Sequence, residues 1–255
     1  MLTALHHFTM RHTRRIVLKR RFPSSFEKVP ILVSSEGGLR YLLKKMKDID
    51  PPLLQLAAEF VKPGAVVWDI GANLGFFSVA AAAKAGSKGM VLALEPDIWL
   101  ASLLCRTVNI QPSTSARIDV LPVAVAERED VRSFCISSFA RAANHLDVHG
   151  SSIAGMARFE QKVVTLSLDW LVEKYPAPQI LKIDVEGAEV EVLRGGRGLL
   201  AASRPIIICE IRSKNTQPIL EILRELHYQI YDAEVAPGAR TALSQPSWNT
   251  LALPS

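Results

Sequence analysis

The chain has 255 residues, of which 49% are hydrophobic and 22% charged, and this composition fits one large globular domain. It contains no apolar run of 18 residues, so we expect no transmembrane helix, and the N-terminus lacks the apolar segment of a secretory signal. The three cysteines are widely spaced and include no CxxC pair, which argues against a disulfide framework or a thiolate zinc site and favours a cytoplasmic protein.

The first 21 residues form a basic leader. They hold six of the 30 basic residues and none of the 25 acidic residues, so the remaining chain has 24 basic against 25 acidic residues. We expect residues 1–21 to be solvated, disordered or only partly ordered, and dispensable for chemistry. A nucleic-acid or anionic-membrane arm and an organellar transit segment are the alternatives. The nearly neutral body argues against nucleic-acid binding by the rest of the protein.

Residues 22–62 are expected to pack on the core as an N-terminal segment. The apolar run at 29–33 predicts a short strand, and residues 51–61 show the apolar spacing of a helix. The main domain is predicted to follow over residues 63–255.

That domain begins with the stretch VVWDIGANLGFFS at residues 66–78. Its apolar start predicts a buried strand, the two glycines Gly71 and Gly75 a tight turn, and residues 76–85 a helix ended by Gly86. Strand, glycine turn and helix form the first unit of a nucleotide-binding α/β sheet. The alternative is a plain turn without a ligand.

The chemistry of this turn favours a ligand that carries both a negative and a positive group. A helix N-terminus attracts a carboxylate, whereas Asp69 at the strand end would repel phosphate and suits an amine or a sulfonium. S-adenosylmethionine, with its amine, carboxylate and nucleoside, fits both. The pattern D-x-G-x-N-x-G also departs from the dinucleotide fingerprint G-x-G-x-x-G, because Asn73 replaces a glycine.

The second unit is an apolar strand at residues 90–94 that ends in Glu95, Pro96 and Asp97. An acid at this place can accept two hydrogen bonds from a ribose diol. The alternative is a solvated loop acid. A helix is predicted over residues 97–108, followed by a third strand over 118–123.

The connection after the third strand is long for a simple crossover. Residues 131–136 and 161–166 are strand-like, which predicts a hairpin insertion at about 131–166 with a mobile loop over the ligand site. His145 and His149 lie in that loop. Ser167 is expected to cap a helix over residues 168–175.

The next two strands, 179–184 and 205–211, again end near acids, and strands are also predicted at 228–232 and 250–253, the final pair antiparallel. Because ligands bind at the carboxyl ends of such strands, Asp184 is our first candidate for a general base and Glu186 the second. Lys182 lies on the same strand face as Asp184 and would pair with it or orient the acceptor.

Other interpretations of these acids remain open. Asp184 and Glu186 could simply complement a helix dipole. Asp184 and Glu210 could share a divalent cation, but no His–carboxylate spacing supports a dedicated metal site, so we predict none. The loop histidines His145 and His149 are the runner-up base.

Five motifs together carry a family resemblance. They are VVWDIGANLGFFS (66–78), ALEPD (93–97), LSLDWL (166–171), LKIDVEGAEVEVLRGG (181–196) and IIICEI (206–211). In order and spacing they resemble the FkbM family of class I, S-adenosylmethionine-dependent methyltransferases, over roughly residues 60–232. Trp68 and Arg212 are not residues that this pattern assigns.

The resemblance implies an α/β fold: a doubly wound, Rossmann-like seven-stranded sheet, mostly parallel with an antiparallel last strand. It implies that the turn over residues 69–75 holds the methionine moiety of the cofactor, Glu95 the ribose, and the segment 123–124 the adenine. The expected cofactor-binding residues are Asp69, Gly71, Ala72, Asn73, Gly75, Phe76, Glu95, Pro96, Asp97, Val123 and Ala124.

The predicted function is methyl transfer from S-adenosylmethionine to a hydroxyl of a sugar or secondary metabolite. The partner is then a small-molecule or glycan acceptor, whose identity, like the oligomeric state, the sequence leaves open. An NAD-type oxidoreductase and a non-catalytic cofactor-binding module are the competing functions.

Overall fold

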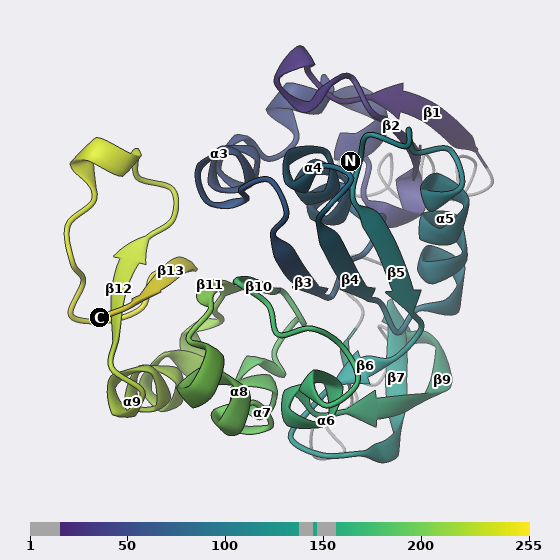
Figure 1. The fold of residues 1–255 in the computed structure, drawn as a ribbon. Helices are drawn as coiled ribbons and strands as arrows, with labels where there is room; N and C mark the ends of the chain where they lie inside the picture. Colours follow the sequence, from purple (N-terminus) through teal and green to yellow (C-terminus); the bar gives the residue numbers. More distant parts are fainter. Residues whose placement is uncertain (1–15, 138–144, 147–156) are drawn as a thin grey trace, which may run out of the picture.

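The computed structural model describes residues 16–137, 145–146 and 157–255, and its centre is a seven-stranded sheet (Figure 1). The strand order is β12-β13-β11-β10-β3-β4-β5, and β13 runs antiparallel to both of its neighbours while β11, β10, β3, β4 and β5 pair in parallel. The strands are β3 (Val66–Ile70), β4 (Met90–Leu94), β5 (Arg117–Leu121), β10 (Ile180–Ile183), β11 (Ile206–Glu210), β12 (Tyr228–Asp232) and β13 (Asn249–Pro254). The predicted sheet, with its antiparallel last strand, is confirmed.

Helices cover both faces of this sheet (Figure 1). One face carries α3 (Pro51–Phe60), α4 (Phe76–Ala85) and α5 (Ile98–Val108), and the other carries α6 (Leu168–Val172), α7 (Glu189–Arg194), α8 (Arg197–Ser203) and α9 (Thr216–Glu225). Side chains alternate across a strand, so Val67 of β3 joins the first apolar core while Trp68 and Ile70 join the second. Each face of the central strands is therefore buried, which explains their continuous apolar sequences.

The N-terminal segment packs on the first of these faces. It contains β2 (Pro30–Ser34), α2 (Arg40–Leu43) and the short 3₁₀ turns Ser24–Phe26, Ser35–Gly37 and Met46–Asp48. The ring of Phe22 lies 5.2 Å from that of Phe76, at the start of α4, and both belong to one apolar core.

The last part of the predicted leader is ordered. Val17–Arg21 forms β1, which pairs antiparallel with β2. Two of its basic side chains find backbone acceptors: Arg20 donates a hydrogen bond to the Tyr41 carbonyl at 2.8 Å, and Arg21 donates one to the Lys28 carbonyl at 3.0 Å. Residues 1–15 of the leader lie outside the described residues.

A second, four-stranded sheet in the order β6-β9-β7-β8 lies beside the carboxyl end of β5 (Figure 1). Its strands are β6 (Ala124–Val125), β7 (Asp130–Ser137), β8 (His145–Leu146) and β9 (Ala157–Leu166), and β7 pairs antiparallel with β9. The expected strands of the hairpin insertion are therefore present. Most of its connecting loop, including His149, lies outside the described residues.

Backbone geometry sets two element boundaries, the end of β5, which was predicted at residue 123, and the start of α7. β5 ends at Leu121 because Pro122 has no N–H to continue the ladder. α7 begins only at Glu189, because Glu186 (φ 56°) and Gly187 (φ 116°) adopt left-handed backbone that cannot continue a helix. In the described ranges no helix has the length and apolar character needed to cross a membrane.

Candidate functional site

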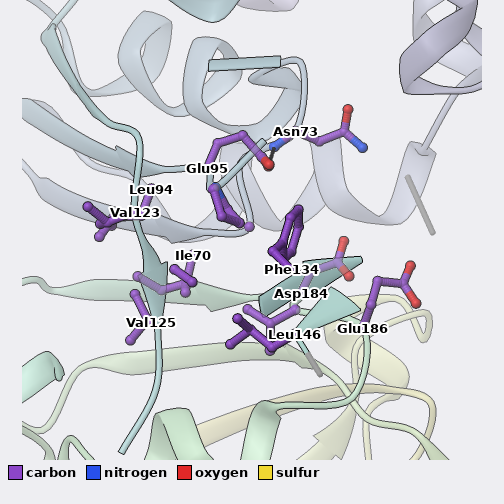
Figure 2. Close-up of a pocket in the computed structure, with 14 residues that line it drawn as sticks. Ile70, Asn73, Leu94, Glu95, Val123, Val125, Phe134, Leu146, Asp184 and Glu186 are labelled. Carbon is purple, nitrogen blue, oxygen red and sulfur yellow. Dashed lines mark hydrogen bonds between the residues drawn. The ribbon is translucent and has the colours of Figure 1, made fainter. Parts of the chain in front are cut away.

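The carboxyl ends of β3, β4 and β10 open into one cavity, which the second sheet walls on its far side (Figure 2). Parallel strands bring these ends to one edge of the sheet. The cavity encloses about 550 Å³ including its open mouth. Its lining residues are Ile70, Gly71, Asn73, Leu94, Glu95, Pro96, Val123, Ala124, Val125, Phe134, Leu146, Asp184, Val185 and Glu186.

Glu95 is the main polar group of the inner half of this cavity. Its Oε2 accepts a hydrogen bond from the Asn73 N–H at 2.7 Å and its Oε1 one from the Asp97 N–H at 2.8 Å. The side chain is only 5% exposed, and burial raises the pKa of Glu95 to about 7, although both N–H donors favour the ionised form. The carboxylate is thus fixed in place with oxygen lone pairs left for a ligand.

The glycine turn has its shape because the neighbouring strand approaches closely. Gly71 has φ +76°, and a Cβ there would lie 1.9 Å from the Asp184 carbonyl oxygen. Asn73 has φ 54° and accepts a hydrogen bond from the Leu74 N–H on its own Oδ1 at 2.7 Å, an arrangement that asparagine tolerates well. Backbone packing therefore requires Gly71, whatever occupies the cavity.

Asp69 lies beneath the turn, on the face of the sheet covered by α4. It is fully buried, and its Oδ2 accepts a hydrogen bond from the Ser78 hydroxyl at 2.5 Å. The register of the parallel strands sets Lys182 directly opposite, so that the Lys182 Nζ lies 3.2 Å from the Asp69 Oδ1. Asp69 therefore holds an internal ammonium group and does not line the cavity.

Lys182 joins three parts of the site. Its Nζ donates to the Gly71 carbonyl at 3.0 Å and lies 3.6 Å from the Asp184 Oδ2, besides its contact with Asp69. Burial opposes its charge, but the two carboxylates outweigh burial and raise the pKa of Lys182 above its usual value. A lysine held protonated in this way can orient groups but cannot accept a proton.

Three carboxylates gather beside the cavity, and two of them, Asp184 and Glu186, line it. The pairing of Ile183 with Cys209 brings the next residues, Asp184 and Glu210, side by side, and Glu186 follows on the turn. In the described part of the chain these three acids can place one oxygen each within 4.8 Å of one another. Three oxygen ligands of a cation adopt such a spacing, and so do neighbouring acids at a sheet edge without one.

The three acids differ in their partners. Arg212 forms an ion pair with Glu186, whereas the Asp184 side chain is 36% exposed and contacts only Lys182 among the ion pairs of the described residues. Burial, followed by the charge of Asp184, raises the pKa of Glu186, while Arg212 opposes that rise. Burial and the charges of Asp184 and Glu186 raise the pKa of Glu210 to about 7. Asp184 is the carboxylate best placed to meet an incoming group.

The structure thus gathers part of the predicted set in one cavity. Gly71, Asn73, Glu95, Pro96, Val123, Ala124, Asp184 and Glu186 line it, whereas Asp69, Ala72, Gly75, Phe76, Asp97 and Lys182 do not. Asp97 instead caps α5, accepting from the N–H groups of Trp99 and Leu100 at 2.9 and 3.3 Å. The Phe76 ring packs into the core against Phe22.

Six lining residues escaped the sequence prediction: Ile70, Leu94, Val125, Phe134, Leu146 and Val185. The predicted strand at 131–136 contained Phe134, but nothing in the sequence said that this strand would face the cavity. In Figure 2 the Phe134 ring is drawn between Glu95 and the acids at the mouth. His145 belongs to β8, but its side chain lies outside what the structure describes, as does all of His149.

The sheet order with its reversed strand β13, and the cavity at the carboxyl edge, are those of a class I, Rossmann-like α/β fold. The sequence profile of the methyltransferase FkbM domain matches residues 69–230, and the chain belongs to that family of enzymes. The resemblance found in the sequence is confirmed.

Individual relatives are more distant. Over 190 residues the chain is 28% identical to the hexuronic acid methyltransferase AglP of Haloferax volcanii, covering 70% of this chain and 73% of that protein. The crystal structure of methyltransferase FkbM from Methylobacillus flagellatus KT superposes with a TM-score of 0.47 at 14% identity, covering 99% of this chain but only 59% of that one. Precorrin-6y C5,15-methyltransferase from Geobacter metallireducens GS-15 gives a TM-score of 0.46 at 13% identity, covering 84% and 91% of the two chains.

Proposed function

We propose that this enzyme transfers the methyl group of S-adenosylmethionine to a hydroxyl group of a sugar. Family membership supports the methyl transfer, and the similarity to a hexuronic acid methyltransferase supports a sugar acceptor. The observation that carries the proposal is that Glu95 and Asp184, which follow two different strands, line a single cavity. The three cysteines are free thiols, which suits a reducing, cytoplasmic setting.

The lining of the cavity fits the cofactor in chemistry. The apolar side chains of Leu94, Val123 and Val125 offer a surface for adenine, and the buried Glu95 carboxylate can accept both hydroxyls of a ribose. The carboxylates at the mouth favour the positive charges of a sulfonium and an amine. Asp69 supports this arrangement from below, through Lys182 and the Gly71 carbonyl, without touching the ligand.

When bound, the cofactor supplies an electrophilic methyl group on a sulfonium, whose sulfur leaves with the bonding electron pair as a neutral thioether. Asp184 accepts the proton of the acceptor hydroxyl as the new oxygen–carbon bond forms. Lys182 holds the Asp184 carboxylate in place and stays protonated throughout. The second sheet, through Phe134 and Leu146, walls the cavity and restricts the entry of water.

The test separates binding from chemistry. Calorimetry should show binding of S-adenosylhomocysteine and none of NAD; binding of NAD alone would favour the oxidoreductase. A tritiated-methyl assay with hexose and hexuronic acid glycosides then tests transfer, and an enzyme that binds the cofactor but transfers to no hydroxyl acceptor would contradict the proposal.

Asp184→Asn tests the assignment of the base. It keeps the shape of the side chain and removes its basicity, so turnover should fall about 10²–10⁴-fold while cofactor affinity changes little. Glu186→Gln is the matched control, because its carboxylate is already paired with Arg212. A larger loss in Glu186→Gln than in Asp184→Asn would transfer the role to Glu186.

A further inference from the structure

A second cavity lies directly beside the first, between α3 and the sheet edge formed by the carboxyl ends of β10 and β11 and the start of β13. It encloses about 400 Å³ including its mouth. Its polar lining is Asp50, Lys182, Asp184, Glu210 and Asn249, and its apolar lining is Leu53, Leu56, Ile183, Ile208 and Ala233. The cavity is therefore amphipathic, with apolar surface from both α3 and the sheet.

Asp184 connects the two cavities, because its side chain lines both. A molecule in the second cavity can thus contact the proposed base at the point where the two cavities meet. Lys182 lines the second cavity as well and fixes Asp184 from below, with its Nζ 3.6 Å from the Asp184 Oδ2. This is the position that an acceptor must take to present a hydroxyl to both Asp184 and the methyl group.

Two further acids of the second cavity have acceptor oxygens to offer. Asp50 caps α3 with its Oδ1, which accepts from the Leu53 N–H at 3.0 Å, and that bond leaves the second oxygen for another donor. The Glu210 carboxylate makes no hydrogen bond or ion pair with any described residue, and its pKa of about 7 reflects burial and nearby charges alone. Both side chains come from elements far apart in the sequence and meet only at this cavity.

The charges of this lining select what can enter. Three carboxylates face the cavity against one ammonium group, and Lys182 already serves Asp69 and Asp184. An anionic group entering here would be repelled, whereas hydroxyl groups can donate to the carboxylates. The apolar wall of Leu53, Leu56 and Ile208 suits the C–H face of a pyranose ring.

We propose that this second cavity is the acceptor subsite and binds the uncharged, hydroxyl-bearing face of one sugar ring, with Asp50 and Glu210 as the residues that determine acceptor specificity. This inference rests on the proposed methyl transfer to a sugar. It adds the location of the acceptor, the face of the ring that enters and two residues outside the catalytic set.

The experiment uses Asp50→Asn and Glu210→Gln in the full chain. Asparagine caps helices as well as aspartate does, so Asp50→Asn keeps α3 intact and removes only the charged acceptor. Glu225→Gln is the matched control, since Glu225 is an exposed acid paired with Arg197. Binding of methyl β-glucopyranoside and methyl β-glucopyranosiduronate is followed by saturation-transfer NMR with S-adenosylhomocysteine present.

We expect wild type and Glu225→Gln to bind the glucoside at least as tightly as the uronide. Each cavity variant should weaken sugar binding, and raise KM in the transfer assay, by about tenfold to a hundredfold. The affinity for S-adenosylhomocysteine and kcat should stay within about threefold of wild type.

Failure of the two proposals would look different. Absence of both cofactor binding and methyl transfer in wild type would contradict the proposed function. If the enzyme binds the cofactor, two results would overturn the acceptor subsite alone: a sugar affinity that is unchanged in Asp50→Asn and Glu210→Gln, or no saturation transfer to either sugar. Clearly tighter binding of the uronide than of the glucoside would overturn the assigned face of the ring.

Discussion

Replacing Lys182 by methionine should destabilise the protein more than any surface ion-pair mutation. The Lys182 side chain is 9% exposed and the Asp69 side chain 0%, so the ammonium group is the counter-charge of a carboxylate that water cannot reach. Methionine has a similar length and fills the space, so the lost packing is small. What remains is a buried carboxylate held by the Ser78 hydroxyl alone among its described hydrogen bonds.

The magnitude follows from this burial. Removing one partner of a buried ion pair costs about 3–5 kcal/mol, because the other charge is left uncompensated. In a protein of this size that loss lowers Tm by about 6–20 °C. Asp69→Asn should cost less, about 1–3 kcal/mol, since Lys182 keeps Asp184 and the Gly71 carbonyl as partners. The double variant should recover part of the loss, by about 1–3 kcal/mol relative to the sum of the two singles.

Urea unfolding at pH 7.5, with linear extrapolation, measures all three variants. Arg197→Met is the control, because the Arg197–Glu225 pair is 50% and 58% exposed and its loss should stay below about 1 kcal/mol. Two results would show that Lys182 and Asp69 are not coupled. One is a loss of stability in Lys182→Met no larger than in this control. The other is that the losses in the two single variants add up to the loss in the double variant within about 0.5 kcal/mol.

Three further outcomes are expected. The pKa of Glu95 is raised to about 7 in the folded protein, so the contribution of Glu95 to stability is present below about pH 4.5 and is lost as pH rises to 7. Between pH 5 and pH 8 the free energy of unfolding in urea should therefore fall by up to about 3 kcal/mol more in wild type than in Glu95→Gln. An equal fall in both proteins would contradict this. Gly71→Ala should destabilise the protein more than Gly64→Ala, by about 1–3 kcal/mol. Both glycines have positive φ, but only a Cβ at Gly71 would meet backbone, at 1.9 Å from the Asp184 carbonyl oxygen. Equal losses of stability would show that this contact does not matter. Deleting residues 1–15 should leave stability and cofactor binding unchanged, whereas deleting residues 1–21 removes β1 and should lower Tm, which thermal unfolding would show.

The sequence predicted the elements of the sheet well because their signals are local. The helix over residues 76–85 starts after one glycine and ends before another, and the structure has α4 at Phe76–Ala85. The strand at residues 228–232 was predicted with the bounds that β12 has. The order of the strands has no such local signal, because no local pattern states which strands pair.

The site was predicted less completely, since lining a cavity depends on side-chain direction and on distant packing. Glu95 and Asp184 lie at or just past the ends of their strands and do line the cavity. Asp69 lies one residue before the end of β3, with its side chain on the α4 face, and there Ser78 and Lys182 enclose it. Phe134 entered the site only through the pairing of the second sheet, which no periodicity in the sequence specifies.

The position of each acid relative to its strand end also explains why three similar residues have three different tasks. Asp69, inside β3, is sealed from water and can act only on Lys182. Glu95, one residue past β4, is buried but held by two backbone N–H groups, which suits a fixed hydrogen-bond acceptor for a neutral diol. Asp184, one residue past β10, keeps 36% of its side chain exposed and lines two cavities, so it is the most open of the three to an incoming group. Because Lys182 bridges Asp69 and Asp184, the buried acid fixes the proposed base, and loss of Asp69 should lower turnover without any contact between Asp69 and substrate.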